Sequence, residues 1–245
     1  MATVRGRLVE VWRWCCGERG EVLALVAVLV VVAGAWAFLE VTGEVIEGDT
    51  QAMDERIVLA MRNADDLSDP IGPRWLEEMA RDITGLGGMA VLGLMTAGVC
   101  GYLLLRRQHW AVGFVLVAVV GGVVLSLFLK SLFDRPRPEV VPHLSYVRTA
   151  SFPSGHSMLS AVVYLTLGAL LARMVTPWRY KLYFLAAALV TTGLVGLSRV
   201  YLGVHYPTDV LAGWSAGLVW ATLCWLGLFL LQRRGKVEPP KGVTA

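Results

Sequence analysis

Hydrophobic residues in this chain gather in long uninterrupted runs, and polar residues gather between them. Six runs are candidates for membrane spans, and they cover residues 21–39, 85–105, 110–129, 157–172, 182–198 and 210–231. A helix needs about 20 apolar residues to cross the hydrocarbon core of a bilayer, so the fourth and fifth runs must be extended by their flanking turns. The pattern predicts an all-α integral membrane protein with six transmembrane helices.

Basic residues gather in every second polar segment, so they lie on one side of the predicted membrane. Arginine and lysine residues precede the first run, separate the second from the third and the fourth from the fifth, and follow the sixth. Because basic residues favour the cytoplasmic side, both termini are predicted to be cytoplasmic. No small-residue cleavage site follows the first run, so we expect the first span to be retained.

The first outer connection, residues 40–84, carries 12 of the chain's 19 acidic residues. Within it, residues 53–66 and 73–88 place apolar side chains at helical spacing. This spacing predicts one or two amphipathic helices in the first outer loop. Periodicity does not distinguish a stripe that faces lipid from one that faces protein. The helices therefore either lie on the outer membrane surface or form a small cap on the protein.

Composition agrees with a membrane protein and excludes other classes. The chain is 56% hydrophobic and 17% charged, whereas soluble domains carry about a quarter charged residues. The net charge of +3 gives no indication of a nucleic-acid partner, and the four cysteines lie mostly in or beside apolar runs, which is typical of packing residues. We expect a single domain over residues 1–245, with cytoplasmic tails at 1–20 and 232–245.

The other two outer connections carry cations on the side of the membrane that the charge rule disfavours. Lys130, Arg135 and Arg137 follow the third span, and Arg199 precedes the last outer loop. Cations in such places usually serve a site, although Arg135 or Arg148 alone is more simply explained by snorkelling to lipid headgroups. Long cationic side chains with many N–H donors are suited to an oxyanion such as phosphate.

Two histidines belong to the same outer clusters. Residues 153–156 read Pro-Ser-Gly-His at the start of the fourth span, where the free backbone N–H groups of a helix can bind an anion. Gly155 would let a ligand approach the backbone closely. Asp209 follows His205 by four residues, so its carboxylate can hold one imidazole nitrogen while the other faces a substrate.

These residues leave other interpretations open. His156, His205 and Asp209 have acceptable spacing for metal ligands, although the neighbouring cations would repel a metal ion. Ser154 is a second candidate for a covalent nucleophile. A transporter or a non-catalytic lipid-phosphate binder could use the same anion pocket, but the sequence shows no convincing repeat and almost no charge at the centres of the spans.

Three motifs occur in order between residues 130 and 209. They are K-x6-R-P from Lys130, P-S-G-H at 153–156, and S-R-x5-H-x3-D ending at Asp209. Together they resemble the type 2 phosphatidic acid phosphatase (PAP2) superfamily, which includes bacterial phosphatidylglycerophosphate and undecaprenyl pyrophosphate phosphatases. The resemblance implies a lipid phosphatase without metal or cofactor, placed in the bacterial cytoplasmic (inner) membrane with its active site facing the periplasm or cell exterior.

The resemblance also implies a role for each site residue. His205 is expected to attack phosphorus and form a phosphohistidine, Asp209 to orient it, and His156 to protonate the leaving group and then activate water. The residues expected to bind the substrate phosphate are Lys130, Arg137, Ser154, Gly155 and Arg199. The expected partner in the bilayer is phosphatidylglycerophosphate, undecaprenyl pyrophosphate, phosphatidate or a lipid A phosphate.

Overall fold

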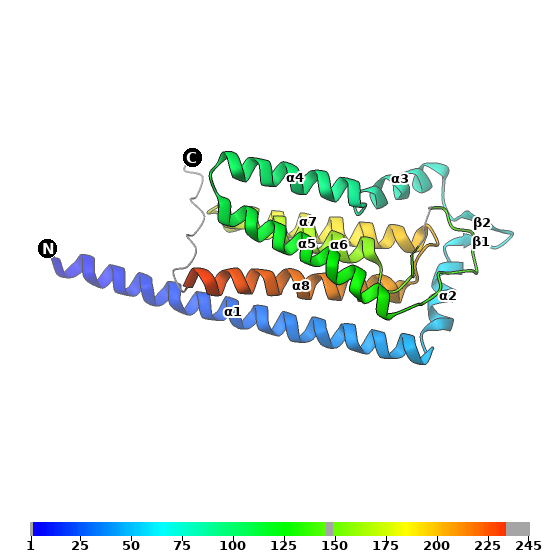
Figure 1. Ribbon diagram of the computed structural model, residues 1–245, viewed down its shortest axis with the longest axis horizontal. Coiled ribbons are helices and arrows are strands. Elements are labelled where there is room, and N and C mark those ends of the chain that lie inside the picture. Colours follow the sequence, from blue (N-terminus) through cyan, green and yellow to red (C-terminus); the bar gives the residue numbers. More distant parts are fainter. Residues whose placement is uncertain (1, 146–148, 234–245) are drawn as a thin grey trace.

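The structure is a computed structural model that describes residues 2–145 and 149–233, with side chains from residue 20 onward. Arg148 and most of the expected C-terminal tail lie outside the described residues. Six helices run along a bundle (Figure 1). They are α1 (Ala2–Glu47), α4 (Met89–Leu105), α5 (His109–Leu132), α6 (Gly155–Met174), α7 (Trp178–Tyr201) and α8 (Pro207–Arg233).

The expected all-α membrane architecture is confirmed. In the described part of the chain, five helices are long and apolar enough to cross a membrane, and they are α5 to α8 together with the Gly20–Glu47 part of α1. Helix α3 (Arg74–Gly85) and α4 meet at an angle of 49°, and taken together as one bent segment they are also long and apolar enough to cross a membrane. The two short apolar runs are indeed extended by their flanking turns in α6 and α7, so the protein is a multi-pass membrane protein.

The second span differs from the expected continuous run over 85–105, because the chain breaks between α3 and α4. Gly87 lies in this break, against α6 and α7. A Cβ atom at Gly87 would lie 2.5 Å from Cγ1 of Val195 and 3.3 Å from Cβ of His156. Only a residue without a side chain allows this close approach, and so the break is held directly against His156.

The first outer connection contains more than the two expected helices. Helix α2 (Gln51–Leu59) ends earlier than expected, and the chain then forms an antiparallel hairpin of β1 (Arg62–Asn63) and β2 (Asp66–Pro70) before α3. The backbone N–H and the hydroxyl of Ser68 both donate to the Asp66 carboxylate. Asparagine and aspartate compete for backbone donors in this way and favour turns over helices.

Both helices of this connection pack on the protein. Val58 of α2 is fully buried in a cluster with Val210 of α8, and Ala80 of α3 is buried beside Leu202. On the other side of α3, Trp75 is 61% exposed. The segment is therefore a cap on the protein that also presents an apolar stripe to its surroundings.

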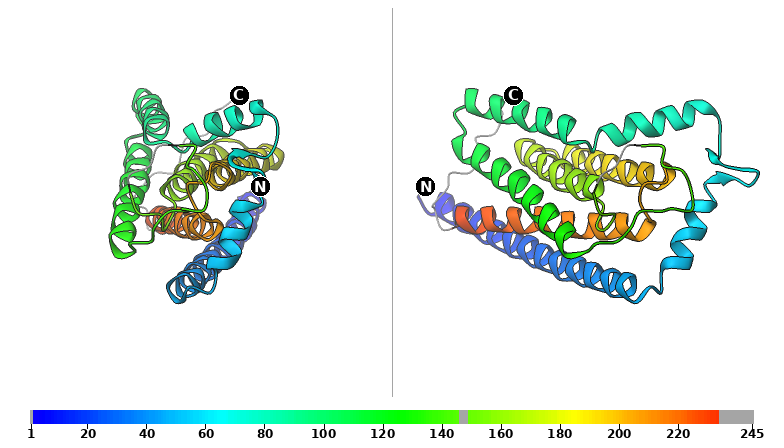
Figure 2. Two further views of the ribbon diagram at one scale, coloured as in Figure 1. Left: turned by 90° about the vertical axis from the view of Figure 1, so that its right-hand side faces the viewer. Right: turned by 45° about the vertical axis from the view of Figure 1, so that its right-hand side comes forward.

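The interhelical connections that carry the sequence motifs gather at one end of the bundle, which we call the loop end. Residues 48–73, 133–145, 149–154 and 202–206 lie there, whereas the start of α1 and the end of α8 lie at the opposite end (Figures 1 and 2). Helix α6 lies inside the bundle and contacts α4, α5, α7 and α8. This arrangement brings the three motifs to one place.

Candidate active site

The three motifs converge on one pocket of about 240 Å³ at the loop end. Six of the eight expected site residues line this pocket, and they are Lys130, Arg137, Gly155, His156, Arg199 and His205. The other two, Ser154 and Asp209, are fully buried behind its wall. Residues that the sequence did not single out, such as Thr149 and Gly87, complete the lining.

His205 is buried between α7 and α8, and both of its ring nitrogens have partners. Nδ1 lies 3.3 Å from Oδ2 of Asp209, and Nε2 lies 3.1 Å from Nη1 of Arg137. A guanidinium can only donate, so Nε2 is the acceptor and the ring proton lies on Nδ1, toward Asp209. The lone pair of Nε2 therefore faces the cation that lines the pocket.

Asp209 is itself held in place by several donors. Its Oδ2 accepts the backbone N–H of Tyr206 at 2.9 Å and the hydroxyl of Ser151, and its Oδ1 accepts Nη1 of Arg135 at 2.7 Å. Both oxygens are thus occupied, which leaves little capacity for a metal ion. Among the residues with described side chains, no three His, Cys, Asp or Glu side chains converge as a metal site would require.

Burial sets the protonation of His205. It lowers the pKa of the imidazole from its ordinary 6.5 to about 3, against the opposing influence of the hydrogen bond to Asp209 and of its charge. Burial also lowers the pKa of Arg137, while the Asp209 charge raises it. The imidazole is therefore neutral near pH 7, which is the form that has a free lone pair.

Lys130 and Arg137 are fixed by main-chain carbonyls. Nζ of Lys130 donates to the carbonyl of Ala150 at 2.7 Å. Nε of Arg137 donates to the carbonyl of Thr149 at 2.9 Å, and its Nη1 donates to the carbonyl of Val204 at 2.6 Å. The loop between α5 and α6 thus orients both cations toward the pocket before any ligand enters.

Arg199, in the last turn of α7, is the third cation of the pocket. It is only 2% exposed, and its Nη1 donates to Oγ1 of Thr84 at 3.0 Å. Its Nε is buried without a partner among the residues that the structure describes. Thr84 lies in the last turn of α3, so the segment 40–84 contacts a cation of the pocket, a contact that the sequence alone did not indicate.

Helix α6 begins where the sequence predicted, with Ser154 as its N-cap. The Ser154 hydroxyl accepts the backbone N–H of Ser157 at 3.4 Å and its hydroxyl at 2.9 Å. His156 lies in the first turn of α6. A Cβ at Gly155 would lie 3.3 Å from Cε of Lys130, so this glycine lets the lysine lie against the helix N-terminus.

The interpretation of Arg135 as a snorkelling residue was wrong. Its side chain is only 10% exposed and forms ion pairs with Asp209 and with Asp54 of α2. A signal for this was present in the sequence, because Arg135 and Arg137 stand two positions apart and each precedes a proline, which favours extended backbone. Alternate residues of an extended segment face the same side, so both arginines could be expected to face the site.

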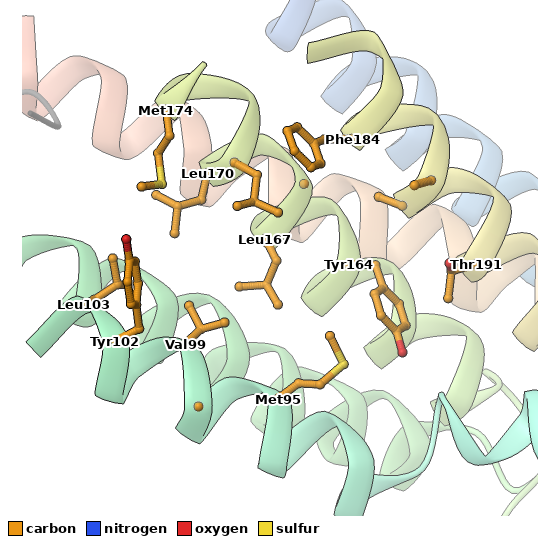
Figure 3. Close-up of a pocket in the computed structure, with 15 residues that line it drawn as sticks. Met95, Val99, Tyr102, Leu103, Tyr164, Leu167, Leu170, Met174, Phe184 and Thr191 are labelled. Atoms are coloured by element: carbon orange, nitrogen blue, oxygen red, sulfur yellow. The ribbon is translucent and has the colours of Figure 1, made fainter. Parts of the chain in front are cut away.

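A larger and mostly apolar cavity of about 540 Å³ lies between α4, α6 and α7 (Figure 3). Met95 and Leu103 of α4 face Leu167 of α6 across it. The hydroxyl of Tyr164, which also lines the cavity, donates to the carbonyl of Leu86 at 2.9 Å in the break between α3 and α4. Helices α4 and α6 thus line both this cavity and the cationic pocket.

The PAP2 superfamily profile matches residues 110–233, a range that contains all three motifs. The chain therefore belongs to the PAP2 superfamily, and its named relatives are phosphatases. Phosphatidylglycerophosphatase B of Bacillus subtilis is 36% identical over 149 residues, which cover 59% of this chain and 71% of that protein. A lipid A 1-phosphatase of Rhizobium etli is 30% identical over 176 residues, which cover 60% and 71%.

A solved structure gives the same result. The crystal structure of a transmembrane PAP2-type phosphatidylglycerolphosphate phosphatase from Bacillus subtilis matches with a TM-score of 0.74 and 30% identity. The match covers 86% of this chain and 98% of that one. The protein is thus an enzyme of the phosphoric monoester or diphosphate hydrolase class, built as a multi-pass membrane protein.

Proposed function

We propose that the protein hydrolyses a lipid phosphate or diphosphate at the loop end, through a phosphohistidine on His205 and without a metal ion. The observation that carries the proposal is that three cations line one pocket with a neutral histidine, whose Nε2 accepts a hydrogen bond from one of them. Phosphoryl transfer depends on positioning and on neutralising charge more than on other protein chemistry. Lys130, Arg137 and Arg199 would supply that neutralisation, with the N-terminus of α6 as a further anion site.

In the first step, Nε2 of His205 attacks phosphorus and the bond from phosphorus to the leaving oxygen breaks. His156, protonated in the substrate complex, gives its proton to that oxygen. Arg137, which contacts Nε2 in the free enzyme, would transfer this donor to a phosphoryl oxygen and so free the nucleophile. Asp209 stabilises the positive charge that develops on the imidazole, through its hydrogen bond to Nδ1–H.

In the second step, a water molecule attacks the phosphohistidine. His156, now neutral, takes the proton of this water as the N–P bond breaks. Inorganic phosphate leaves and Nε2 regains its lone pair. One P–O bond of the substrate has then been hydrolysed, and both histidines have returned to their starting states.

The hydrocarbon part of the substrate would occupy the apolar cavity between α4, α6 and α7 (Figure 3). Met89 and Leu159 line the cationic pocket, and Met95 and Tyr164 line the apolar cavity five or six residues further along the same two helices. That distance is about 7–9 Å along a helix, so a lipid with its phosphate at the cations can place its chain there. Candidate substrates are phosphatidylglycerophosphate, undecaprenyl pyrophosphate, phosphatidate and a lipid A phosphate, met in the outer leaflet of the inner membrane.

The alternative function is a lipid-phosphate binder that retains the pocket without turnover. An anion site gains nothing from a histidine whose second nitrogen is aligned by a buried carboxylate. The order of Nε2, Nδ1–H and Asp209 instead matches what an activated nucleophile needs. We therefore favour the enzyme.

The test is to trap the intermediate with phosphatidylglycerophosphate that carries a radiolabelled terminal phosphate. Purified wild type should take up alkali-stable, acid-labile label, and His205→Ala should take up none while still binding the lipid. His109→Ala is the matched control, because His109 is exposed and lies far from the loop end. Turnover by the wild type without label, or label retained in His205→Ala, would overturn the proposed nucleophile.

The role of His156 needs a comparison of two leaving groups. His156→Ala should form the phosphohistidine slowly from the lipid ester, because an alkoxide leaves poorly without a proton. With p-nitrophenyl phosphate, whose leaving group departs unaided, formation should be far less impaired. Equal losses for the two substrates in this step would show that His156 is not the general acid.

A further inference from the structure

We propose that Asp54, in the cap over the site, is a positioning residue for the hydrolysis. It acts through Arg135 on Asp209, and so on the nucleophile His205. This inference rests on the proposed function, because it assigns a role within the same reaction. It gives residues 40–84 a part in catalysis, although none of them lines the pocket.

The carboxyl side chain of Asp54 is completely buried and forms an ion pair with Arg135. Its Oδ1 accepts the backbone N–H of Thr208 at 3.1 Å, and its Oδ2 accepts the Thr208 hydroxyl at 2.5 Å and Nη2 of Arg135 at 2.8 Å. Thr208 directly precedes Asp209 in the first turn of α8. The carboxylate therefore fixes the beginning of the helix that carries Asp209.

Arg135 lies between two carboxylates. One of its terminal nitrogens binds Asp54 and the other binds Asp209 at 2.7 Å. Its guanidinium also lies 4.5 Å from the ring centroid of Tyr206, and Gln51 accepts a further hydrogen bond from it at 3.2 Å. A planar guanidinium with this many partners has one orientation available, and its orientation sets that of Asp209.

Anchoring of α2 does not by itself explain a buried charge. Val58, four residues further along α2, already packs in an apolar cluster with Val200 and Val210. Burying a carboxylate is expensive unless it is paired and hydrogen-bonded, so an apolar residue would anchor the helix at less cost. A carboxylate at position 54 is explained if it balances the positive charge of Arg135, which also contacts Asp209.

The direction of the effect follows from this balance. With Asp54 ionised, the charge of Arg135 is shared between two carboxylates, and Asp209 keeps its negative charge available to the imidazole of His205. If Asp54 becomes neutral, Arg135 pairs with Asp209 alone, so the carboxylate stabilises the developing positive charge on His205 less well. The phosphate is held by other cations and should still bind.

Asp54→Asn tests this with the shape of the side chain retained. We expect kcat to fall about 10- to 100-fold, the range found when a residue that orients a metal-bound side chain is changed, while KM changes less than about twofold. The rate of phosphohistidine formation in a single turnover should fall by the same factor as kcat. Asp49→Asn is the matched control, because it makes the same change at an exposed aspartate just before α2.

A double variant separates positioning from anchoring. If Asp54 acts through Arg135, then Asp54→Asn combined with Arg135→Gln should lose less than the product of the two single losses. Val58→Ala should lower the thermal midpoint in detergent with kcat per folded molecule unchanged. An Asp54→Asn variant that behaves like Val58→Ala, or whose loss multiplies with that of Arg135→Gln, would overturn the proposal. Failure of the proposed function would differ, since wild type would then take up no label.

Discussion

Gly213→Ala offers a sharp test of how the two catalytic helices are held together. Gly213 lies on α8, four residues after Asp209, and faces the start of α6. A Cβ at this position would lie 2.6 Å from the carbonyl oxygen of Ser154 and 3.2 Å from the backbone nitrogen of Met158. Both contacts are to main chain, so no side chain can rotate away and one of the helices must move.

The size of the movement follows from the contact distance. A carbon atom and a carbonyl oxygen normally approach to about 3.3 Å, so α6 and α8 must separate by about 0.7 Å. Overpacking of this kind costs about 1–3 kcal/mol of stability. A misplacement of about 1 Å can reduce a reaction rate about 100-fold, so separating His156 from His205 by 0.7 Å should slow phosphohistidine formation by a factor of about 10 to 100.

The assay is single-turnover labelling from a lipid phosphate, together with thermal unfolding in detergent. Gly227→Ala is the matched control, because Gly227 lies on the same helix and a Cβ there meets nothing within 4 Å. It should unfold at the same temperature as wild type or slightly higher and retain its activity. If Gly213→Ala matches this control in both measurements, the close contact of α6 with α8 does not align the site, and the reasoning is refuted.

Four further predictions test the apolar cavity, the role of the cations, the orientation of the protein in the membrane and the buried imidazole of His205. Gly98→Phe should fill the apolar cavity, because Gly98 lines it with open space at its Cβ. It should raise KM for a long-chain lipid phosphate and not for a short-chain one, whereas Gly93→Phe, on the same helix but away from the cavity, should do neither. Activity should survive EDTA and be inhibited by vanadate, which resembles the phosphoryl transition state; loss in EDTA that a divalent ion restores would indicate a metal site. In a background without the native cysteines, Ala60→Cys should react with an impermeant thiol reagent in intact cells and Trp178→Cys should not, since both positions are exposed at opposite ends of the bundle; the reverse result would place the site in the cytoplasm. Because the pKa of His205 falls from 6.5 to about 3 on folding, the unfolded state takes up the proton first on acidification. The contribution of His205 to the free energy of unfolding should therefore be full above pH 6.5 and decline from there toward pH 3. The free energy should decline less in His205→Asn; equal declines would show that His205 is not the group responsible.

The sequence by itself predicted the apolar spans, the end of the bundle where the motifs meet and six of the residues that line the cationic pocket. Long apolar runs indicate membrane spans without knowledge of the tertiary contacts, because each helix satisfies its own backbone hydrogen bonds. The motifs stand at the ends of these runs, so the six spans alone carry Lys130, His156 and His205 to one end of the bundle. The start of α6 at Ser154 was also predictable, because helix capping depends on neighbours in the sequence.

Only the tertiary structure decided which residues hold the pocket-lining residues and Asp209 in place. Asp54 and Arg135 are 81 residues apart along the chain, and no local pattern distinguishes a buried ion pair from two surface charges. The end of α2 at Leu59 and the hairpin after it likewise depend on turn hydrogen bonds that compete with helical ones. The contacts of Thr84 with Arg199 and of Gly87 with His156 arise because α3 folds back against α7. Such contacts join segments remote in sequence, and their energies depend on geometry that periodicity and spacing do not record.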